Sequence, residues 1–158
     1  DISTVNVRDE RNEPIGRIYV KGGIQRSANE PARYLEKSKI PALIDELPLL
    51  AVVGTQLDGG IEIHDAGELR HKETDRLSAT AENLRKMGAE VIENRDGLVV
   101  SGPSRLRGAT ISSYGDHRIA MAFSVAALVA DGTTEIAGAD CVRISFPEFF
   151  ELLKSVSN

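Results

Sequence analysis

The sequence has 158 residues and a formal net charge of −5 at pH 7, and 41% of its residues are hydrophobic. A chain of this length can bury a core as one ordinary domain, and the composition is that of a globular protein. Aromatic residues make up only 4%, which argues against a base-stacking nucleic-acid surface. The negative charge argues against general binding to phosphate backbones or anionic membranes. Any anion site must therefore be local and shaped.

Two further features bear on where the protein works. Cys141 is the single cysteine, so one chain can form neither a disulfide framework nor a zinc cluster of cysteines, and we expect a small buried side chain. No signal peptide is recognisable, and no apolar run approaches the ~20 residues of a membrane span. We expect a cytoplasmic protein. The sequence starts at Asp1 without an initiator methionine, which we interpret as the interior of a longer protein.

The first predicted elements are two short strands at residues 4–7 and 16–20, joined through the turn-rich stretch 11–14. A polar loop follows, with a turn of helix expected near Tyr34.

The next segment predicts a helix that is apolar nearly all round and therefore buried. Asp45 can cap its N-terminus, and Pro48 then lies in its first turn. We expect the helix to stop near residues 58–60 and a strand to follow at 61–64.

A charged stretch, residues 72–76, is expected at the start of the second helix. Positions four apart share a helix face, so Lys72 and Arg76 would stand side by side, with Glu73 next to them. The N–H groups of a helix start also favour an anion. The pattern suits an anionic ligand held between two cations, although a solvated helix face remains the alternative for this stretch alone. The apolar stripe of this helix comprises Leu77, Ala81, Leu84 and Met87.

The remaining elements follow in close succession. A hairpin around Asp96-Gly97 joins strands at 90–93 and 98–100, and another strand is expected at 109–112. A third, apolar helix begins after Asp116, which can cap it, and runs to residue 130.

A strand at 133–136 and a last helix complete the predicted elements. Ser145-Phe146-Pro147-Glu148 would start that helix as a capping box.

These segments repeat. Asp45 precedes an apolar helix and lies fifteen positions before Gly60, and Asp116 precedes another and lies sixteen positions before Gly132. The spacing indicates a duplicated unit with the order strand-helix-strand-helix-strand-strand. We expect residues 1–16 to end a preceding unit, 17–101 to form one unit and 102–158 to form a second.

Four motifs resemble one family, that of 5-enolpyruvylshikimate-3-phosphate synthase, also called 3-phosphoshikimate 1-carboxyvinyltransferase. They are Ile44-Asp45-Glu46-Leu47-Pro48, Glu68-Leu69-Arg70-His71-Lys72-Glu73-Thr74-Asp75-Arg76, Tyr114-Gly115-Asp116-His117-Arg118-Ile119-Ala120-Met121 and Ser145-Phe146-Pro147. The resemblance implies an α/β (α+β) fold of six βαβαββ units in two domains, an inside-out α/β barrel. This chain would be its C-terminal portion, and its partner would be the missing N-terminal domain.

The resemblance also implies a reaction of the shikimate pathway, in aromatic amino acid biosynthesis. The enolpyruvyl group of phosphoenolpyruvate passes to the 5-hydroxyl of shikimate 3-phosphate, and phosphate is released. No metal or organic cofactor would be needed, and neither nucleic acid nor a membrane would be a partner. Both substrates are anions, which would account for the clustered cations.

Site residues follow from the same resemblance. Asp45, Lys72 and Glu73 would be catalytic, and Asp45 and Lys72 would also bind shikimate 3-phosphate. The phosphoenolpyruvate-binding arginines would be Arg76, Arg118 and Arg143. A guanidinium can hold a carboxylate or phosphate with two bonds. The division of protons among Asp45, Lys72 and Glu73 stays open at this point.

Two positions depart from the family pattern. Some members have a substrate-binding lysine where this chain has Ile144, and Arg143 is expected to supply the charge. Some members have asparagine where this chain has Glu68.

Several neighbouring residues are expected to be structural. Asp116 would cap its helix and pair with Arg118, and Asp75 would support the arginine geometry. His117 could line the site or be structural. His64 and His71 are interpreted as ordinary exposed histidines.

Two alternatives remain. The chain could be an isolated α/β domain that binds anions weakly without catalysis, and for these residues alone we expect an inactive fragment. It could also belong to the enolpyruvyl transferases of UDP-N-acetylglucosamine, which share the fold but are not expected to combine the second and third motifs.

Overall fold

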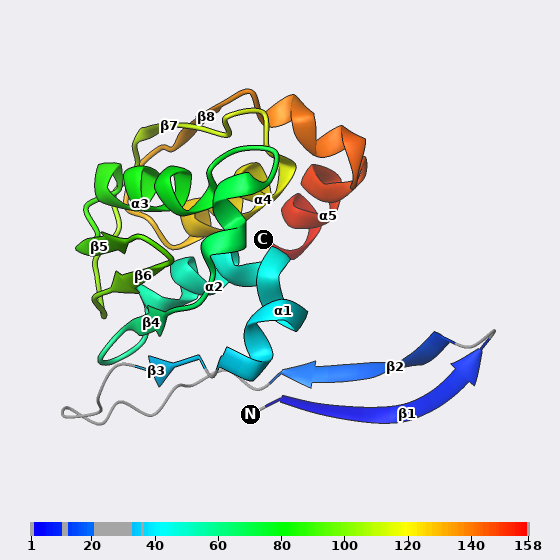
Figure 1. Cartoon of the computed structure of the whole chain (residues 1–158). Coiled ribbons are helices and arrows are strands. Elements are labelled where there is room, and N and C mark those ends of the chain that lie inside the picture. The colour runs from blue at the N-terminus through cyan, green and yellow to red at the C-terminus, as the bar shows by residue number, and fades with distance from the viewer. Residues whose placement is uncertain (1, 11–12, 21–32, 36, 158) are drawn as a thin grey trace.

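The computed structural model describes residues 2–10, 13–20, 33–35 and 37–157 (Figure 1). It combines helices with small sheets, as the α/β prediction requires. The elements are β1 (Ile2–Glu10), β2 (Glu13–Val20), β3 (Arg33–Tyr34), η1 (Lys37–Lys39), α1 (Ile40–Leu43), η2 (Ile44–Glu46), α2 (Leu47–Gly54), β4 (Ile61–Ile63), η3 (Gly67–His71), α3 (Arg76–Lys86), β5 (Val91–Asn94), β6 (Gly97–Val100), β7 (Thr110–Ser112), α4 (His117–Leu128), β8 (Glu135–Ala137), η4 (Ala139–Ile144) and α5 (Phe149–Val156).

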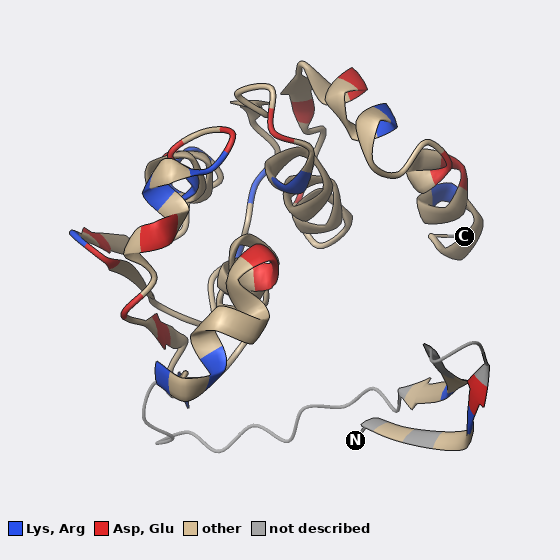
Figure 2. Ribbon diagram, turned by 45° about the vertical axis from the view of Figure 1, so that its right-hand side comes forward, with Lys and Arg blue, Asp and Glu red and all other residues tan. Residues whose placement is uncertain are grey.

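The strands of the described residues form three small sheets. β1 and β2 make an antiparallel hairpin that lies apart from the helices in both ribbon views (Figures 1 and 2). The second sheet has the strand order β3-β4-β6-β5, and the third contains β7 and β8. The hairpin predicted around Asp96-Gly97 is confirmed as β5–β6. Part of the predicted turn at 11–14 and the polar loop at 21–32 lie outside the described residues.

The helices α2 and α4 form the centre of the fold, where they pack against each other. Both are rich in apolar residues, so burying them against one another and against α3 removes most of their surface from water. Leu47, Ala51 and Phe123 are all at most 1% exposed. The buried character predicted for these two helices is thus confirmed at the residues that face the core.

A sequence repeat is visible in the backbone. β3 pairs in parallel with β4 and β7 pairs in parallel with β8, and a buried apolar helix connects each pair, α2 in the first and α4 in the second. A 3-10 helix and then an α-helix follow each pair, η3 and α3 after the first and η4 and α5 after the second. The division at residues 16 and 101 stays a prediction.

Three local predictions before residue 60 are wrong. Tyr34 lies in a strand, because the backbone next to it bonds to the edge of β4. Asp45 does not cap a helix, since it lies within η2 and its carboxylate faces arginines instead. α2 ends at Gly54, because the next residues close turns on the helix carbonyls.

Two other helix starts were also predicted wrongly. Lys72 and Arg76 do not share a helix face, because Lys72 is extended and α3 begins at Arg76. The capping box at Ser145 does not form, because α5 begins at Phe149 and its N-cap, Glu148, makes no side-chain cap hydrogen bond. Cys141 is only partly buried rather than buried.

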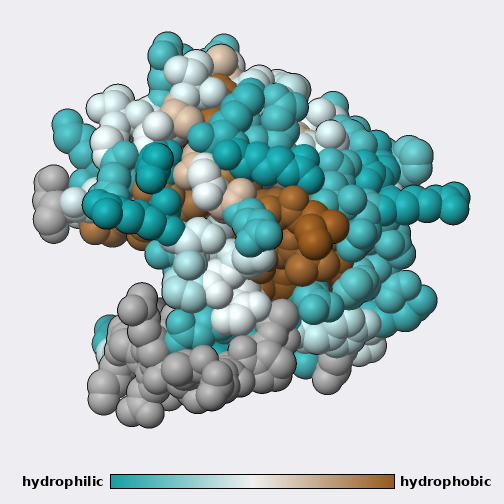
Figure 3. Space-filling model, turned by 90° about the vertical axis from the view of Figure 1, so that its left-hand side faces the viewer, coloured by the Kyte–Doolittle hydropathy of each residue, from teal (hydrophilic) through white to brown (hydrophobic). Residues whose placement is uncertain are grey.

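The surface is mainly polar but not uniformly so. Figure 3 shows a brown patch set within a largely teal face. Apolar side chains are also exposed on the N-terminal hairpin and on α5, where Ile18 is 69% and Leu152 is 51% exposed. None of the described helices is long and apolar enough to cross a membrane.

Candidate functional site

Arg76 is the centre of a charged cluster between η2, α3 and α4. Its side chain is only 1% exposed, and its Nε lies 2.7 Å from Oδ2 of Asp116. Nη1 donates to Oδ1 of Asp45 at 2.9 Å, and Nη2 donates to Oε2 of Glu73 at 2.7 Å. The guanidinium therefore joins carboxylates from three separate parts of the chain, which burial of an arginine requires.

Asp116 holds the Arg76 guanidinium from the N-terminal end of α4. It is 0% exposed and caps α4 by accepting bonds from the backbone N–H groups of Arg118 and Ile119. The predicted cap is thus confirmed. The predicted partnership with Arg118 is made through the Arg118 backbone N–H at 2.8 Å, whereas the Arg118 side chain reaches η2 and the carboxylate also faces Arg76.

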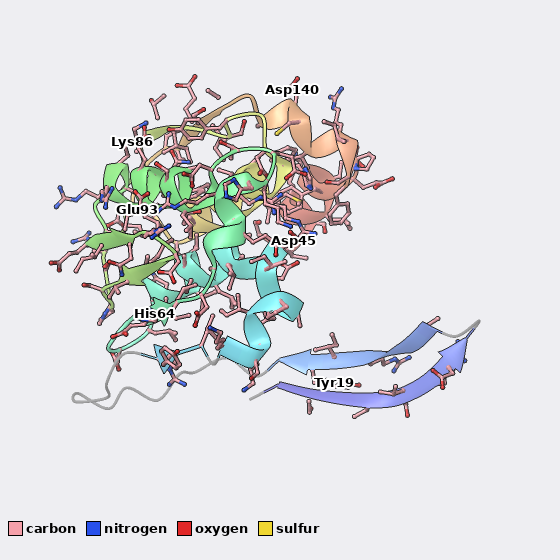
Figure 4. All side chains as sticks on the ribbon, viewed as in Figure 1. Tyr19, Asp45, His64, Lys86, Glu93 and Asp140 are labelled. Carbon is pink, nitrogen blue, oxygen red and sulfur yellow. The ribbon has the colours of Figure 1, made fainter. Side chains whose placement is uncertain are left out.

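Asp45 lies at the end of the cyan helical segment that faces the C-terminal helices (Figure 4). Besides Arg76, it faces Arg118, with Nη2 at 3.5 Å, and Lys72, with Nζ at 4.0 Å. Partial burial raises the pKa of Asp45, but the charges of Arg118, Arg76 and Lys72 outweigh it and hold the pKa below its usual value. Asp45 is therefore ionised at neutral pH and can accept a hydrogen bond from a hydroxyl.

Lys72 lies between Asp45 and an exposed carboxylate. Its Nζ is 2.8 Å from Oε1 of Glu68, and the hydrogen bond to Glu68 raises the pKa of Lys72 against a smaller effect of burial. The nearby Arg76 works in the opposite direction. Lys72 is thus held as a cation rather than as a neutral amine.

Arg118 extends the cluster toward a cavity. Its Nη1 lies 2.6 Å from Oε1 of Glu46 and 3.2 Å from the Asp45 carbonyl oxygen. The cavity has a volume of about 380 Å³, and its polar lining consists of Asp45, Glu46, His117, Arg118 and Ser145. Its apolar lining includes Leu49, Met121, Val125, Phe146 and Phe149. His117 therefore lines the site.

The cluster as it stands carries more negative than positive charge. Its three cations are Lys72, Arg76 and Arg118. They are paired with five carboxylates, those of Asp45, Glu46, Glu68, Glu73 and Asp116. Figure 2 accordingly shows red and blue segments interleaved where the helices meet. An anionic ligand can therefore bind here only if it displaces carboxylates from these cations or if another part of the protein supplies further cations.

Arg143 is not part of this cluster. It lies in η4 and is exposed, and no hydrogen bond or ion pair joins it to another of the described residues. Its neighbour Ile144 is 80% exposed. The part of the chain described by the structure brings Asp45, Lys72, Glu73, Arg76 and Arg118 together and leaves Arg143 aside.

Arg70 has a structural role that the sequence alone does not reveal. Its Nη1 pairs with Asp75 at 2.8 Å and with Glu93 at 3.0 Å. Its remaining nitrogens donate to the carbonyl oxygens of Asn94 and Arg95 in the β5–β6 turn. Asp75 in turn caps α3 at Ser78 N, so Arg70 fixes the start of the helix that carries Arg76. The sequence feature that could have pointed to this role is the position of Arg70 inside the charged motif at residues 68–76.

The remaining charged residues near the cluster make contacts outside it. His64 Nε2 lies 3.1 Å from Oε2 of Glu62, and His71 is exposed. Asp75 supports an arginine as expected, although this arginine is Arg70 and not Arg76.

Comparisons with known proteins agree with the motifs. The sequence model of the family "EPSP synthase (3-phosphoshikimate 1-carboxyvinyltransferase)" matches residues 12–153. The chain is 49% identical over 158 residues to the 3-phosphoshikimate 1-carboxyvinyltransferase of Salinibacter ruber, covering 99% of this chain and 36% of that protein. The enzyme of the same name from Koribacter versatilis is 61% identical over 115 residues, which are 73% of this chain and 27% of that protein.

The fold is likewise similar to that of a solved structure. EPSP synthase from Acinetobacter baumannii superposes with a TM-score of 0.88 at 34% sequence identity, covering 98% of this chain and 36% of that one. The chain thus spans about a third of the length of these relatives. On the match over residues 12–153 and these similarities, the chain belongs to the EPSP synthase, or 3-phosphoshikimate 1-carboxyvinyltransferase, family.

Proposed function

We propose that this chain is the C-terminal portion of an enzyme that transfers the enolpyruvyl group of phosphoenolpyruvate to the 5-hydroxyl of shikimate 3-phosphate and releases phosphate. The observation that carries the proposal is the grouping of Asp45, Glu73 and Arg76 by direct bonds within a family whose relatives bear that name. As part of the same proposal, the longer protein works in the cytoplasm, as the resemblance implies.

The catalytic roles fall to Asp45, Lys72 and Glu73. The reaction needs a carboxylate beside the reacting hydroxyl, a proton donor to the methylene carbon of phosphoenolpyruvate, and cations on the substrate anions. Asp45 is ionised, which suits a hydrogen bond to the sugar-ring hydroxyl, and the protonated Lys72 beside it suits the bound phosphate ester. Glu73 is half-exposed, with 51% of its side chain accessible, so it can face a substrate while Arg76 positions it.

Arg76, Arg118 and Arg143 are proposed to bind phosphoenolpyruvate. Arg118 supports this best, because it lines the cavity and its partner Glu46 is exposed enough to turn away. For Arg76, binding would require Asp45 or Glu73 to give up a guanidinium nitrogen. Arg143 lies outside the cluster, so it could contact the substrates only if another part of the protein held it close to them.

The chain alone is proposed to be inactive. Its cluster holds five carboxylates against three cations, so two substrate anions would meet a net negative charge. The missing N-terminal domain is the partner that would add cations and close the site against water. The same charge balance disfavours the alternative of a domain that binds anions by itself.

The test is a phosphate-release assay with phosphoenolpyruvate and shikimate 3-phosphate. The chain alone is expected to show no turnover. A chimaera that joins it to the complementary segment of the Salinibacter ruber relative is expected to turn over. Turnover by the chain alone would refute the inactivity, and a folded chimaera without turnover would refute the assigned reaction. A chimaera with Glu90→Gln, an exposed position outside the cluster, is expected to turn over like the unaltered chimaera and serves as the control for substitutions within the cluster.

A further inference from the structure

Two buried polar side chains lie on one face of α3. Arg76 and Asn83 are 1% and 0% exposed, and because they are seven positions apart, two helical turns bring them to the same side of the helix. A buried polar group requires hydrogen-bond partners. Arg76 has its partners in the charged cluster, whereas Asn83 makes no contact with a residue of that cluster and must be explained separately.

The partner of Asn83 is the backbone of Ser112, the last residue of β7. Nδ2 of Asn83 donates to the Ser112 carbonyl oxygen at 2.8 Å, and Oδ1 accepts the Ser112 N–H at 3.3 Å. A side-chain amide can make both bonds because it carries a donor and an acceptor side by side. Asn83 therefore ties the end of β7 to α3 with two hydrogen bonds.

Ser112 leads directly into the turn that carries Asp116. Tyr114 and Gly115 both have positive φ angles in this turn, 55° and 75°. A side chain other than glycine adopts that conformation only when its surroundings hold it there. The Ser112 Oγ accepts the Tyr114 N–H at 3.1 Å, and the Ser113 carbonyl oxygen accepts the Asp116 N–H at 3.0 Å. The position of Asp116 thus depends on the position at which β7 ends.

Two polar links consequently join α3 to the same segment. One is Asn83 with Ser112, and the other is Arg76 with Asp116. Seven residues of a helix span about 10 Å, so the links lie far apart along α3. Apolar packing is not directional, whereas hydrogen bonds are. The two links together therefore fix both the direction of α3 and its rotation about its own axis.

The rotation of α3 determines the direction of the Arg76 guanidinium. Its Nη1 bonds to Asp45 and its Nη2 bonds to Glu73, and neither carboxylate belongs to α3. A turn of the helix would move these two nitrogens relative to both carboxylates. Asn83 touches neither carboxylate and acts on them only through α3 and Arg76.

We propose that Asn83 is a positioning residue for the enolpyruvyl transfer, an inference that rests on the proposed function. Its two hydrogen bonds to Ser112 hold α3 in the orientation that directs the Arg76 guanidinium to the catalytic carboxylates. A displacement of about 1 Å at a catalytic group can lower a rate by about 10² even when its cause is distant. Asn83 therefore affects turnover without contacting a substrate.

The test uses two variants and one control. Asn83→Leu keeps the branched shape of the side chain and removes both polar atoms, so the two bonds are lost without a cavity. Asn83→Ser is too short to reach Ser112, and its hydroxyl can bond the helix carbonyl four residues back, as Ser124 does in α4. The control, Thr55→Val, removes a buried side-chain bond to a backbone carbonyl at the end of α2 away from the cluster.

The first measurement is steady-state kinetics of the active chimaera, at a temperature at which circular dichroism shows every variant to be folded. Both Asn83 variants are expected to lower kcat about tenfold or more and to change KM only a few-fold, because the groups that bind the substrates remain. The control is expected to keep kcat within about twofold, since a loss of stability alone does not slow a folded enzyme.

The second measurement uses the chain alone and does not depend on turnover. Burial raises the pKa of Asp45, and Arg118 and Arg76 are the main charges that hold it low. A turned α3 moves Arg76 away, so the pKa of Asp45 should rise toward 3.8 in both Asn83 variants and stay unchanged in the control. NMR titration of the Asp45 carboxyl carbon follows this change.

Two results would overturn the proposal. One is a kcat in the Asn83 variants within about twofold of the control, and the other is an Asp45 pKa in these variants equal to that of the unaltered chain. Asn83→Ser decides if Asn83→Leu does not fold. A folded, unaltered chimaera without turnover would instead refute the assigned reaction and with it any role of Asn83 in that reaction, so the two failures are distinguishable.

Discussion

The Nε of Arg76 lies 2.7 Å from Oδ2 of Asp116, and the two side chains are 1% and 0% exposed. The residues are 40 positions apart and belong to the starts of α3 and α4. One buried ion pair thus joins the starts of the two helices that carry Arg76 and Arg118. Removing one member of such a pair leaves an uncompensated buried charge.

Asp116→Ala is accordingly expected to lower the free energy of unfolding by about 3–5 kcal/mol. The variant also loses the N-cap of α4, which is part of the same carboxylate. Asp116→Asn should cost less, because an amide still caps the helix. Urea denaturation measures both. Asp140→Ala, at an exposed aspartate, is the control and should stay within about 0.5 kcal/mol of the unaltered chain. An alanine variant at position 116 as stable as that control would contradict the prediction.

The stability contributed by Asp45 should depend on pH. Burial raises its pKa, but Arg118, Arg76 and Lys72 together lower it below the value of 3.8. A carboxyl group whose pKa is depressed on folding stabilises the folded state above its unfolded pKa, and this contribution is lost as pH falls through the folded pKa. The difference in urea midpoint between the unaltered chain and Asp45→Asn is therefore expected to be constant near pH 6 and to shrink below about pH 4. A difference that grew on acidification would have the wrong sign.

The catalytic proposal makes a kinetic prediction for the active chimaera. Glu73→Gln and Asp45→Ala should lower kcat by about 10²–10⁴, as loss of a general acid or base does, and change KM only a few-fold. Steady-state kinetics with both substrates measures this split. A large rise in KM with unchanged kcat would assign the residue to binding, and near-normal turnover would remove it from the catalytic set.

Much of this site could be predicted from the sequence because the motifs occur as short contiguous runs. Asp45, Lys72, Glu73, Arg76 and Arg118 were all identified, and the structure brings them together. The local geometry could not be predicted so well. The sequence predicts one helix for Lys72 and Arg76, but α3 starts only at Arg76. Asp75 is its N-cap, since the Asp75 carboxylate accepts the Ser78 N–H.

The partners of the charges were harder to predict than the charges. Asp45 has the sequence context of a cap, but two arginines distant in sequence attract its carboxylate more strongly than the backbone of α2. Arg70 looked like one more basic residue, since its role depends on the β5–β6 turn more than twenty positions later. Long-range pairing of this kind leaves no periodic signal in the sequence.

The ion pair of Lys72 with Glu68 should be visible in a titration. The hydrogen bond to Glu68 is the main cause of the raised pKa of Lys72, so Glu68→Gln should move that pKa down toward 10.5. NMR titration of the lysine side-chain carbon next to Nζ follows the change. Glu90→Gln, which alters an exposed glutamate elsewhere, should leave the Lys72 curve unchanged. An unchanged curve in Glu68→Gln would show that the pair does not persist in solution.

Arg70 follows the buried Leu69 and Arg143 follows the buried Val142, yet the two arginines should respond very differently to the same substitution. Arg70→Ala removes charge-assisted bonds to Asp75 and Glu93 and two bonds to turn carbonyls, so we expect a loss of about 2 kcal/mol in the free energy of unfolding.

Arg143→Ala is expected to change the free energy of unfolding by no more than about 0.5 kcal/mol, because Arg143 is exposed and pairs with no described residue. The rate of amide hydrogen exchange in the β5–β6 turn should rise in Arg70→Ala and stay unchanged in Arg143→Ala. Equal losses in the two variants would show that Arg143 has a partner within its own chain, and no loss in either would show that Arg70 does not hold the hairpin.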